Sequence, residues 1–210
     1  MTSKGDQYAR KAAGWSDDGY ADTDSYLDHR AELIATLGVP LVPGDEVLDL
    51  ACGDGGLGEH VLPRGLRYTG IDAEPEMVDA ARRRLGERGV VGVGDLNAFV
   101  PAAPVAATTV FRAIYYVHDR RAFFARVARF TERKLVFDLN PRRYAVEAVV
   151  AELDEAGFDR VLLRPFFVPQ TRQLPGPAIA LAKAAERTGP LARLALRARF
   201  TYLVAACQTG

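Results

Sequence analysis

The residues best suited to ligand binding lie where a buried strand is expected to run into a glycine-rich turn. Positions 47–56 read Val-Leu-Asp-Leu-Ala-Cys-Gly-Asp-Gly-Gly, an apolar run followed at once by small residues. Small residues let a ligand approach the backbone, and the first turn of a following helix leaves N–H groups free to point at it. The spacing of Gly53, Gly55 and Gly58 also fits a dinucleotide fingerprint. Because Asp54 would then stand beside a pyrophosphate, a ligand with a cationic amino-acid end is the better electrostatic partner.

Further side chains capable of chemistry follow three other apolar runs. Asp72 ends one run, Asp95 comes shortly after the next, and Tyr115, Tyr116 and His118 follow a third. The carboxyl ends of parallel strands meet at one edge of a sheet, so these side chains are expected to share one site. An ordinary histidine, with a pKa of about 6.5, suits proton removal at neutral pH, which makes His118 a candidate general base. The alternatives stay open: Asp72 as a helix cap, Asp95 as an ordinary loop acid and His118 as an exposed loop residue.

The elements that must position these residues follow from the spacing of apolar side chains. Strands are predicted at 47–51, 67–72, 90–93, 105–114, 135–139, 160–167 and 200–206. Helices are predicted at 25–37, from 57 onward, at 75–85, 119–130, 144–155 and 178–187, with a short last helix ending near 197. This alternation predicts an α/β fold in which a parallel sheet carries helices on both faces.

Composition and charge exclude several classes of protein. The 210 residues fit one domain, 1–210, with 1–40 as an N-terminal cap and 166–198 as an insert or lid before the last strand. Lys and Arg number 27, as do Asp and Glu, so the basic excess needed to grip nucleic acid or an anionic membrane is missing. The two cysteines make neither a disulfide framework nor a zinc site, and no apolar run is long enough to span a bilayer. We therefore expect a cytoplasmic protein with no metal, no nucleic-acid partner and no membrane partner. Whether it is a monomer or a homodimer stays open.

Taken in order, these motifs resemble those of the class I S-adenosylmethionine-dependent methyltransferases of the small, single-domain type. The family's first motif reads roughly Val-Leu-Asp-Leu-Gly-Cys-Gly-Thr-Gly, and residues 47–55 match it closely with Ala51 in place of the first glycine. Residues 68–72, followed by Met77 and an Ala-Ala-Arg run, look like the family's second strand and helix. Residues 94–96 look like its third motif. The ordered resemblance covers about residues 47–141.

The resemblance implies a fold, a cofactor and a set of cofactor-binding residues. The implied fold is a doubly wound, Rossmann-like sheet of seven mostly parallel strands whose last strand is antiparallel. The implied cofactor is S-adenosyl-L-methionine, with its ribose hydroxyls on the strand-end acid, here Asp72, and its adenine amino group on the third motif's acid, here Asp95. Arg30 could pair with the cofactor's carboxylate, although a lone arginine on an amphipathic helix is more often at the surface. The candidate cofactor-binding residues are Arg30, Asp49, Ala51, Gly53, Asp72, Ala73, Met77, Asp95, Leu96 and Arg112.

The implied activity is methyl transfer to an oxygen or nitrogen atom of a small-molecule acceptor, in specialised metabolism. Tyr115, Tyr116 and His118 are the candidate catalytic or acceptor-contacting residues, because in this family the end of the fourth strand opens onto the acceptor. Apolar residues of the insert either line an acceptor pocket or cover the sheet edge; they are Phe166, Phe167, Pro169, Leu174, Ile179 and Leu181. Two alternatives stay open: a protein that binds the cofactor without methyl transfer, and a nicotinamide-dependent reductase.

Two side chains are expected to play ordinary structural roles. The carboxylate of Asp49 is expected to accept hydrogen bonds from neighbouring backbone N–H groups. His29 is expected on the solvated face of the first predicted helix.

Overall fold

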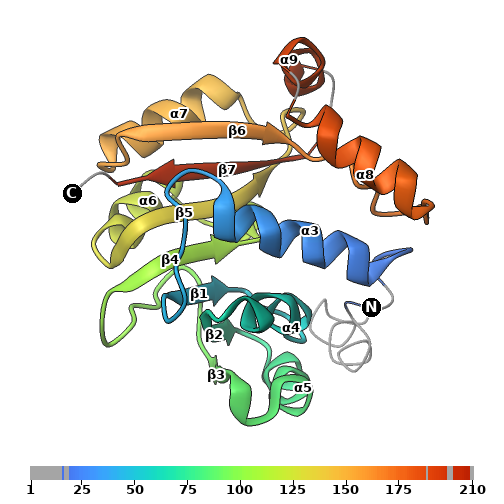
Figure 1. The fold of residues 1–210 in the computed structure, drawn as a ribbon. Helices are drawn as coiled ribbons and strands as arrows, with labels where there is room; N and C mark the ends of the chain where they lie inside the picture. The colour runs from blue at the N-terminus through green and yellow to red at the C-terminus, as the bar shows by residue number, and fades with distance from the viewer. Residues whose placement is uncertain (1–15, 17–18, 188, 198–200, 209–210) are drawn as a thin grey trace, which may run out of the picture.

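The computed structural model describes residues 16, 19–187, 189–197 and 201–208, and its centre is a seven-stranded sheet (Figure 1). The strands are β1 (Glu46–Leu50), β2 (Arg67–Asp72), β3 (Val90–Val93), β4 (Val105–Val110), β5 (Thr131–Leu139), β6 (Arg160–Pro165) and β7 (Tyr202–Cys207). Their order in the sheet is β3-β2-β1-β4-β5-β7-β6. β7 pairs antiparallel with β5 and β6, whereas the other neighbouring pairs are parallel. The predicted doubly wound α/β fold is therefore confirmed.

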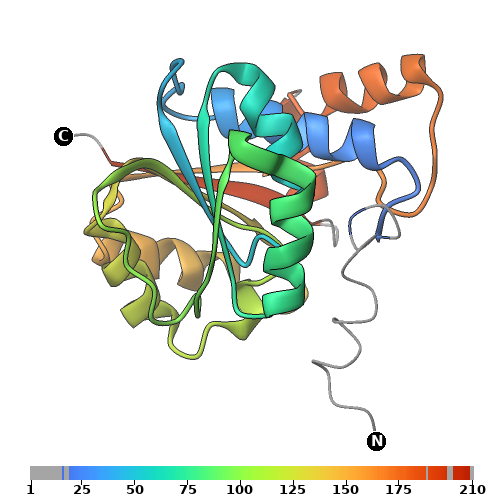
Figure 2. The same ribbon diagram turned by 90° about the horizontal axis from the view of Figure 1, so that it is seen from below.

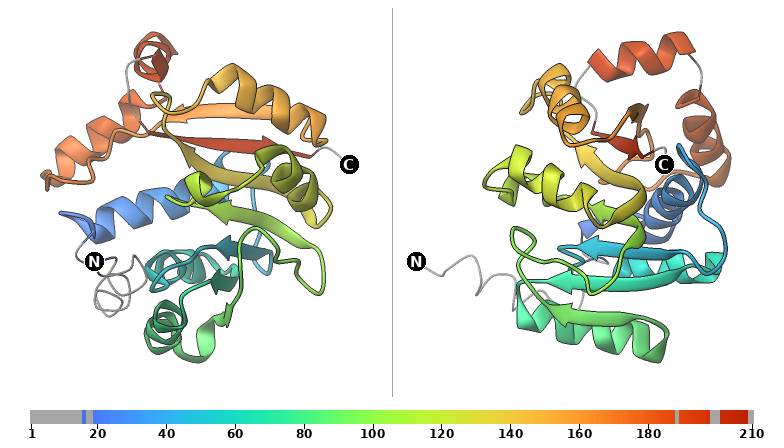
Figure 3. Two further views of the ribbon diagram at one scale, coloured as in Figure 1. Left: turned by 180° about the vertical axis from the view of Figure 1, so that it is seen from behind. Right: turned by 90° about the vertical axis from the view of Figure 1, so that its left-hand side faces the viewer.

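Helices cover both faces of the sheet, as the alternation of side chains along each strand requires (Figure 3). One face carries α3 (Thr23–Thr36), α4 (Gly56–Val61) and α5 (Pro75–Leu85), and the other carries α6 (Arg120–Ala128) and α7 (Val146–Glu155). In β1, Val47 belongs to the first apolar core, whereas Leu48 and Leu50 belong to the second. None of the helices in the described part of the chain is long and apolar enough to cross a membrane.

Two strand boundaries differ from the prediction by four residues, and both differences have a local cause. β4 ends at Val110 instead of residue 114, because Arg112 adopts a left-handed conformation with φ of 53° and a 3-10 turn follows at Ile114–Tyr116. β5 begins at Thr131, earlier than the predicted residue 135, because Thr131 pairs with Val105 of β4. Both strands still deliver their carboxyl ends to the same edge of the sheet.

The insert before β7 contains α8 (Gly176–Ala185) and α9 (Gly189–Arg197). α8 lies beside α3 (Figures 1 and 2), and the Nζ atom of Lys183 is 3.1 Å from the carboxylate of Glu32 on α3. α9 packs against β6. The insert therefore braces α3 from outside and covers the β6 edge of the sheet.

A buried lysine of β5 holds the last turn of α3. The Nζ atom of Lys134 donates hydrogen bonds to the carbonyl oxygens of Leu37, at 2.9 Å, and Ala35, at 3.4 Å. Carbonyl groups at a helix C-terminus have no partner within the helix, so the ammonium satisfies groups that would otherwise be orphaned. Lys134 is fully buried, and this burial lowers the pKa of its side chain to about 8.

Candidate cofactor site

A cavity of about 500 Å³ lies at the carboxyl ends of β1, β2 and β4, beside α3. Its volume is in the range of about 300–1,000 Å³ that small-molecule and cofactor sites occupy. All of the candidate cofactor-binding residues line it, and so do Tyr115, Tyr116 and His118. Its wall also includes Asn97, to which the sequence alone gave no role.

The turns after β1 and β4 bring strained backbone to the cavity wall. The φ angles are 62° at Ala51, 58° at Gly53 and 53° at Arg112. Residues other than glycine adopt this left-handed region at a cost of about 1–2 kcal/mol. Ala51 occupies the position of the first glycine in the methyltransferase motif that residues 47–55 resemble. The backbone of Ala51 therefore has a conformation that glycine would adopt more easily.

Asp49 lies on the cavity wall and bonds to hydroxyl groups, not to the backbone N–H groups expected from the sequence. Its two carboxylate oxygens accept hydrogen bonds from the hydroxyls of Tyr68 and Thr109, each at 2.7 Å. Burial raises the pKa of Asp49 to about 6, although both hydroxyls favour the ionised form. When ionised, this carboxylate presents negative charge to a cationic ligand.

Asp72 is held by the backbone at the end of β2. The N–H of Gly53 donates to one carboxylate oxygen at 2.8 Å, and the N–H of Glu74 donates to the other at 3.0 Å. Glu74 is the N-cap of α5, so Asp72 is not the helix cap that the sequence left open. Burial raises the pKa of Asp72 above its ordinary value. Each oxygen of a carboxylate accepts more than one hydrogen bond, so both retain capacity for a pair of ligand hydroxyls.

Asn97 joins Asp95 to the loop after β4. Its backbone N–H and its side-chain nitrogen donate to the same carboxylate oxygen of Asp95, at 2.8 and 3.1 Å. The side-chain nitrogen also donates to the carbonyl oxygen of Tyr116 at 3.2 Å, and the side-chain oxygen accepts from the N–H of His118 at 3.1 Å. Asp95 and His118 therefore lie at the same end of the cavity. The exposed imidazole of His118 makes no hydrogen bond to any residue that the structure describes.

Arg30 lies on the other side of the cavity, toward the ends of β4 and β5. Its side chain is 3% exposed and stacks on Phe111, with the guanidinium carbon 4.1 Å from the ring centre. It donates to the hydroxyl of Tyr26 at 3.0 Å and lies 3.6 Å from the carboxylate of Asp138. That carboxylate also accepts the N–H of Arg112 at 2.7 Å. Arg30 is therefore buried at the cavity wall and does not take the surface position that a lone arginine on an amphipathic helix usually has.

Asp54 does not line the cavity. Its carboxylate accepts hydrogen bonds from the backbone N–H of Ser16, at 3.0 Å, and from the Ser16 hydroxyl. It also pairs with Arg84 of α5 at 3.0 Å. The electrostatic argument that placed Asp54 beside a pyrophosphate therefore loses its basis. Asp54 instead fastens Ser16 and α5 to the turn after β1.

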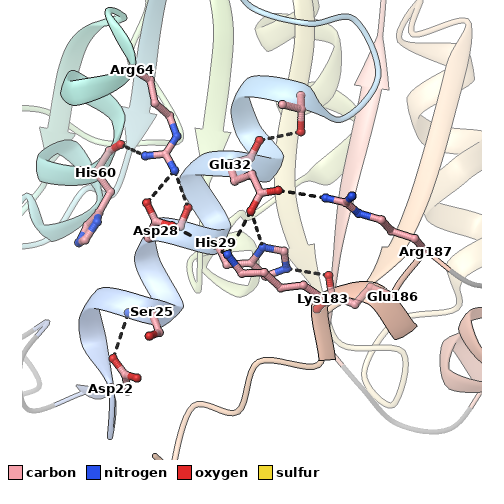
Figure 4. A network of polar contacts seen from close by, with 11 residues as sticks. Asp22, Ser25, Asp28, His29, Glu32, His60, Arg64, Lys183, Glu186 and Arg187 are labelled. Atoms are coloured by element: carbon pink, nitrogen blue, oxygen red, sulfur yellow. Dashed lines mark hydrogen bonds and ion pairs between the residues drawn. The ribbon is translucent and has the colours of Figure 1, made fainter. Parts of the chain in front are cut away.

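His29 is buried between α3 and the insert, so its predicted place on a solvated face is wrong (Figure 4). Its Nε2 atom lies 2.7 Å from the carboxylate of Glu186, and its Nδ1 atom lies 3.3 Å from that of Glu32. Two basic side chains of the insert also pair with Glu32 (Figure 4). The described residues of α8 and α9 do not line the 500 Å³ cavity. The contacts of the insert with Glu32 and His29 instead hold α3, the helix that carries Arg30 to the cavity wall.

A comparison with protein families identifies the segment that builds this site. The Methyltransferase domain family matches residues 47–134, which run from β1 into β5 and include the acids at the ends of β1, β2 and β3. Residues 47–134 form a class I S-adenosylmethionine-dependent methyltransferase domain. The resemblance inferred from the motifs is thus confirmed.

Similar proteins cover different shares of this methyltransferase. An uncharacterized methyltransferase of Schizosaccharomyces pombe is 38% identical over 68 residues, which are 32% of this chain and 26% of that protein. The chain therefore aligns with about a quarter of that curated relative. Among solved structures, a chain from the complex between the Haloferax volcanii Trm112 methyltransferase activator and a methyltransferase has a TM-score of 0.69 and 18% identity, covering 100% of both chains. The (4+2)-cyclase SpnF has a TM-score of 0.67 and 18% identity, covering 97% of this chain and 94% of that one.

The donors and acceptors on the wall of the methyltransferase's cavity fit S-adenosylmethionine, the cofactor of the family. Asp72 offers acceptors for a diol, and Asp49 offers negative charge for a cationic group. Arg30 offers positive charge for a carboxylate, while Met77 and Leu96 add buried apolar surface. No group of three or more metal-binding side chains occurs among the residues described.

Proposed function

We propose that this methyltransferase transfers the methyl group of S-adenosylmethionine to an oxygen or nitrogen atom of a small molecule, in specialised metabolism. The observation that carries the proposal is the 500 Å³ cavity, which has Asp72 and Asp95 toward β2 and β3 and Arg30 toward β5. The cofactor supplies a methyl group that its sulfonium already activates. The protein therefore has chiefly to align the reacting atoms and to exclude water.

Each part of the cofactor has a partner on the wall of the cavity in this proposal. Asp72 accepts hydrogen bonds from the two ribose hydroxyls, and the second oxygen of Asp95 accepts one from the adenine amino group. Asp49 stabilises the cationic methionine end, and Arg30 pairs with its carboxylate. Met77 packs against the adenine ring, since it is buried and lines the same side of the cavity.

This orientation changes the role expected for His118. Asn97 is hydrogen-bonded to both Asp95 and His118, so adenine bound at Asp95 lies beside His118. We infer that His118 serves the adenine end, and that Tyr115 and the tyrosine after it form the exposed rim of the cavity. The methyl acceptor then approaches from the side of Arg30.

A second candidate function is cofactor binding without methyl transfer. The fold likeness to the (4+2)-cyclase SpnF supports it, because that likeness extends over nearly the whole chain. Among the described residues, no carboxylate is hydrogen-bonded to the exposed His118 imidazole to orient it as the base that an acceptor losing a proton would need.

Two measurements test the proposal. Calorimetric titration with S-adenosylmethionine, S-adenosylhomocysteine and NADH should give binding of the first two and none of NADH. Incubation with a library of small acceptors should then release S-adenosylhomocysteine and give a product heavier by one methyl group. Tight cofactor binding with no acceptor-dependent S-adenosylhomocysteine would favour the second candidate. Binding of NADH in place of S-adenosylmethionine would instead favour a reductase.

A further inference from the structure

A second, smaller cavity of about 210 Å³ adjoins the cofactor cavity. α3 contributes Tyr26 and Arg30 to its wall, the end of β5 contributes Asp138, and the segment after β6 contributes Phe166 and Phe167. Arg30 lines both cavities, so they are neighbours at this residue. A molecule in the smaller cavity therefore lies at the end of the cofactor cavity from which the acceptor is inferred to approach.

Arg30 has hydrogen-bonding capacity that the described protein atoms leave unused. Its side chain is 3% exposed and donates to the hydroxyl of Tyr26 at 3.0 Å. The carboxylate of Asp138 is 3.6 Å away, too far for a normal hydrogen bond. The buried Nε atom has no hydrogen-bond partner among the described residues. A buried charged donor without a partner is costly, so this arrangement favours a ligand atom that accepts a hydrogen bond.

Asp138 supplies the complementary group on the same wall. One carboxylate oxygen accepts the N–H of Arg112, and the other faces Arg30. The opposite charges of Asp138 and Arg30 offset each other, so the pair favours a neutral ligand over an ion. A hydroxyl group can donate to the carboxylate and accept from the guanidinium at once.

Most of the remaining wall of the smaller cavity is aromatic and apolar, with Gln170 and Thr201 as its other polar residues. The rings of Tyr26 and Phe166 lie 4.9 Å apart, and Phe167, Val168 and Leu203 complete this surface. Aromatic walls pack well against a flat apolar ring. A volume of 210 Å³ lies below the range of about 300–1,000 Å³ for drug-sized ligands, so the cavity suits a molecule of about one ring.

We propose that the smaller cavity is the acceptor subsite and that the acceptor is a small phenol, with its hydroxyl between Arg30 and Asp138. This rests on the proposed function, because it places the reacting methyl group at the Arg30 end. The phenol oxygen forms a bond to the methyl carbon while the carbon–sulfur bond breaks, and that electron pair stays on sulfur. The phenolic proton passes to the Asp138 carboxylate and then to solvent. Arg30, which also pairs with the carboxylate of the cofactor in the proposed function, donates from another of its five N–H groups to the phenol oxygen and stabilises the negative charge that develops there.

Ligand-detected NMR titration tests the subsite, with 4-methylphenol as the probe and toluene, benzoate and benzylamine as comparisons. The titrations are run with the free protein and with protein saturated with S-adenosylhomocysteine. We expect 4-methylphenol to bind at least about tenfold more tightly than each comparison, as one bidentate polar contact allows. Thr201→Trp fills the exposed rim of the smaller cavity and should abolish probe binding while changing S-adenosylhomocysteine affinity less than about twofold. Thr36→Trp, outside both cavities, is the matched control and should bind the probe like the parent.

A further variant tests the hydroxyl contact itself. Asp138→Asn should weaken 4-methylphenol binding by about tenfold and leave toluene binding unchanged. Should this variant fail to fold, Thr201→Trp still decides whether the probe occupies the cavity. Equal affinity for 4-methylphenol and toluene, tighter binding of benzoate or benzylamine, or unchanged probe binding in Thr201→Trp would each overturn the phenol subsite. Failure of the parent to bind S-adenosylhomocysteine would overturn the proposed function instead, and the free-protein titration would still report on the cavity.

Discussion

The backbone N–H of Gly53 donates a hydrogen bond to the carboxylate of Asp72 over 2.8 Å. This contact joins the turn after β1 to the end of β2, two strands that are neighbours in the sheet. Asp72 therefore has two tasks: it fixes the position of the turn, and it presents its remaining acceptor capacity to the cavity. A change at Asp72 should affect cofactor binding more than a change at any exposed acid nearby.

Asp72→Ala should weaken S-adenosylmethionine binding by about 1–3 kcal/mol, because two ribose hydroxyls lose a charged acceptor. Isothermal titration gives the affinity directly. Asp79→Ala is the matched control, since Asp79 lies on α5 with a side chain 62% exposed and pairs with Arg82 at 3.5 Å. The proposed orientation of the cofactor fails if both variants bind it as the parent does.

Adenosine affinity should report on the end of the cavity that holds Asp95 and His118. Asp95→Asn keeps one acceptor oxygen and should have a mild effect, whereas Asp95→Leu should weaken adenosine binding by about tenfold or more. His118→Ala should also weaken adenosine binding while leaving turnover within about threefold. A fall in turnover of about 10²-fold with unchanged adenosine affinity would restore His118 as the general base.

The strands and the acids at their ends could be predicted because local sequence decides them. The apolar run of β1, followed by small residues, predicts a strand and a turn without reference to the rest of the chain. The same reasoning failed at His29, and for Arg30 it left a surface position open beside the cofactor-binding role. On an isolated helix both look like surface residues, and they become buried only because α8, Phe111 and Asp138 pack against α3.

The acceptor side of the site depends on similar contacts between distant segments. Asp138 lies in a run that predicts only a strand and a turn, and its partner Arg30 is more than 100 positions away. The role of Asn97 could not be predicted from the sequence for the same reason. It depends on hydrogen bonds to Tyr116 and His118, which the loop after β4 brings close to Asn97. Neither residue stands in a motif, and spacing alone gives no signal for them.

The affinity for S-adenosylmethionine should rise with pH through the pKa of Asp49, which burial raises to about 6. Below pH 6 the carboxylate is protonated and gives no charge to the cationic end of the ligand, whereas above pH 6 it is ionised. For a single group titrating near 6, the affinity should rise about tenfold between pH 5 and pH 7. Titrations at those two values measure the rise. Asp49→Asn should flatten it, and a variant with the parent's full pH dependence would contradict this role.

Ala51→Gly should stabilise the fold by about 0.5–1 kcal/mol. The substitution releases the strain of a left-handed alanine, and the extra chain entropy of glycine offsets only part of that gain. Denaturant unfolding measures the change. Ala113→Gly is the control, because Ala113 also lines the cavity but has φ of −131°, where a side chain is unstrained, so this variant should be destabilised. A loss of stability in Ala51→Gly would contradict the expected strain.

Lys134 should contribute a rise of about 2 kcal/mol to the free energy of unfolding between pH 8 and pH 10, because burial lowers its pKa to about 8 in the folded state. In that range the unfolded chain still binds the proton that the folded protein has released, so a higher pH favours the fold. Cys52 and the buried tyrosines Tyr26, Tyr68 and Tyr202 act in the opposite direction, because burial raises their pKa values and the unfolded chain loses their protons first. Urea unfolding at pH 8, 9 and 10 measures the slope. Between pH 8 and pH 10 the free energy of unfolding should therefore change by about 2 kcal/mol more in the stabilising direction for the parent and for Lys183→Met than for Lys134→Met. An equal slope in all three proteins would place the pH dependence in other groups.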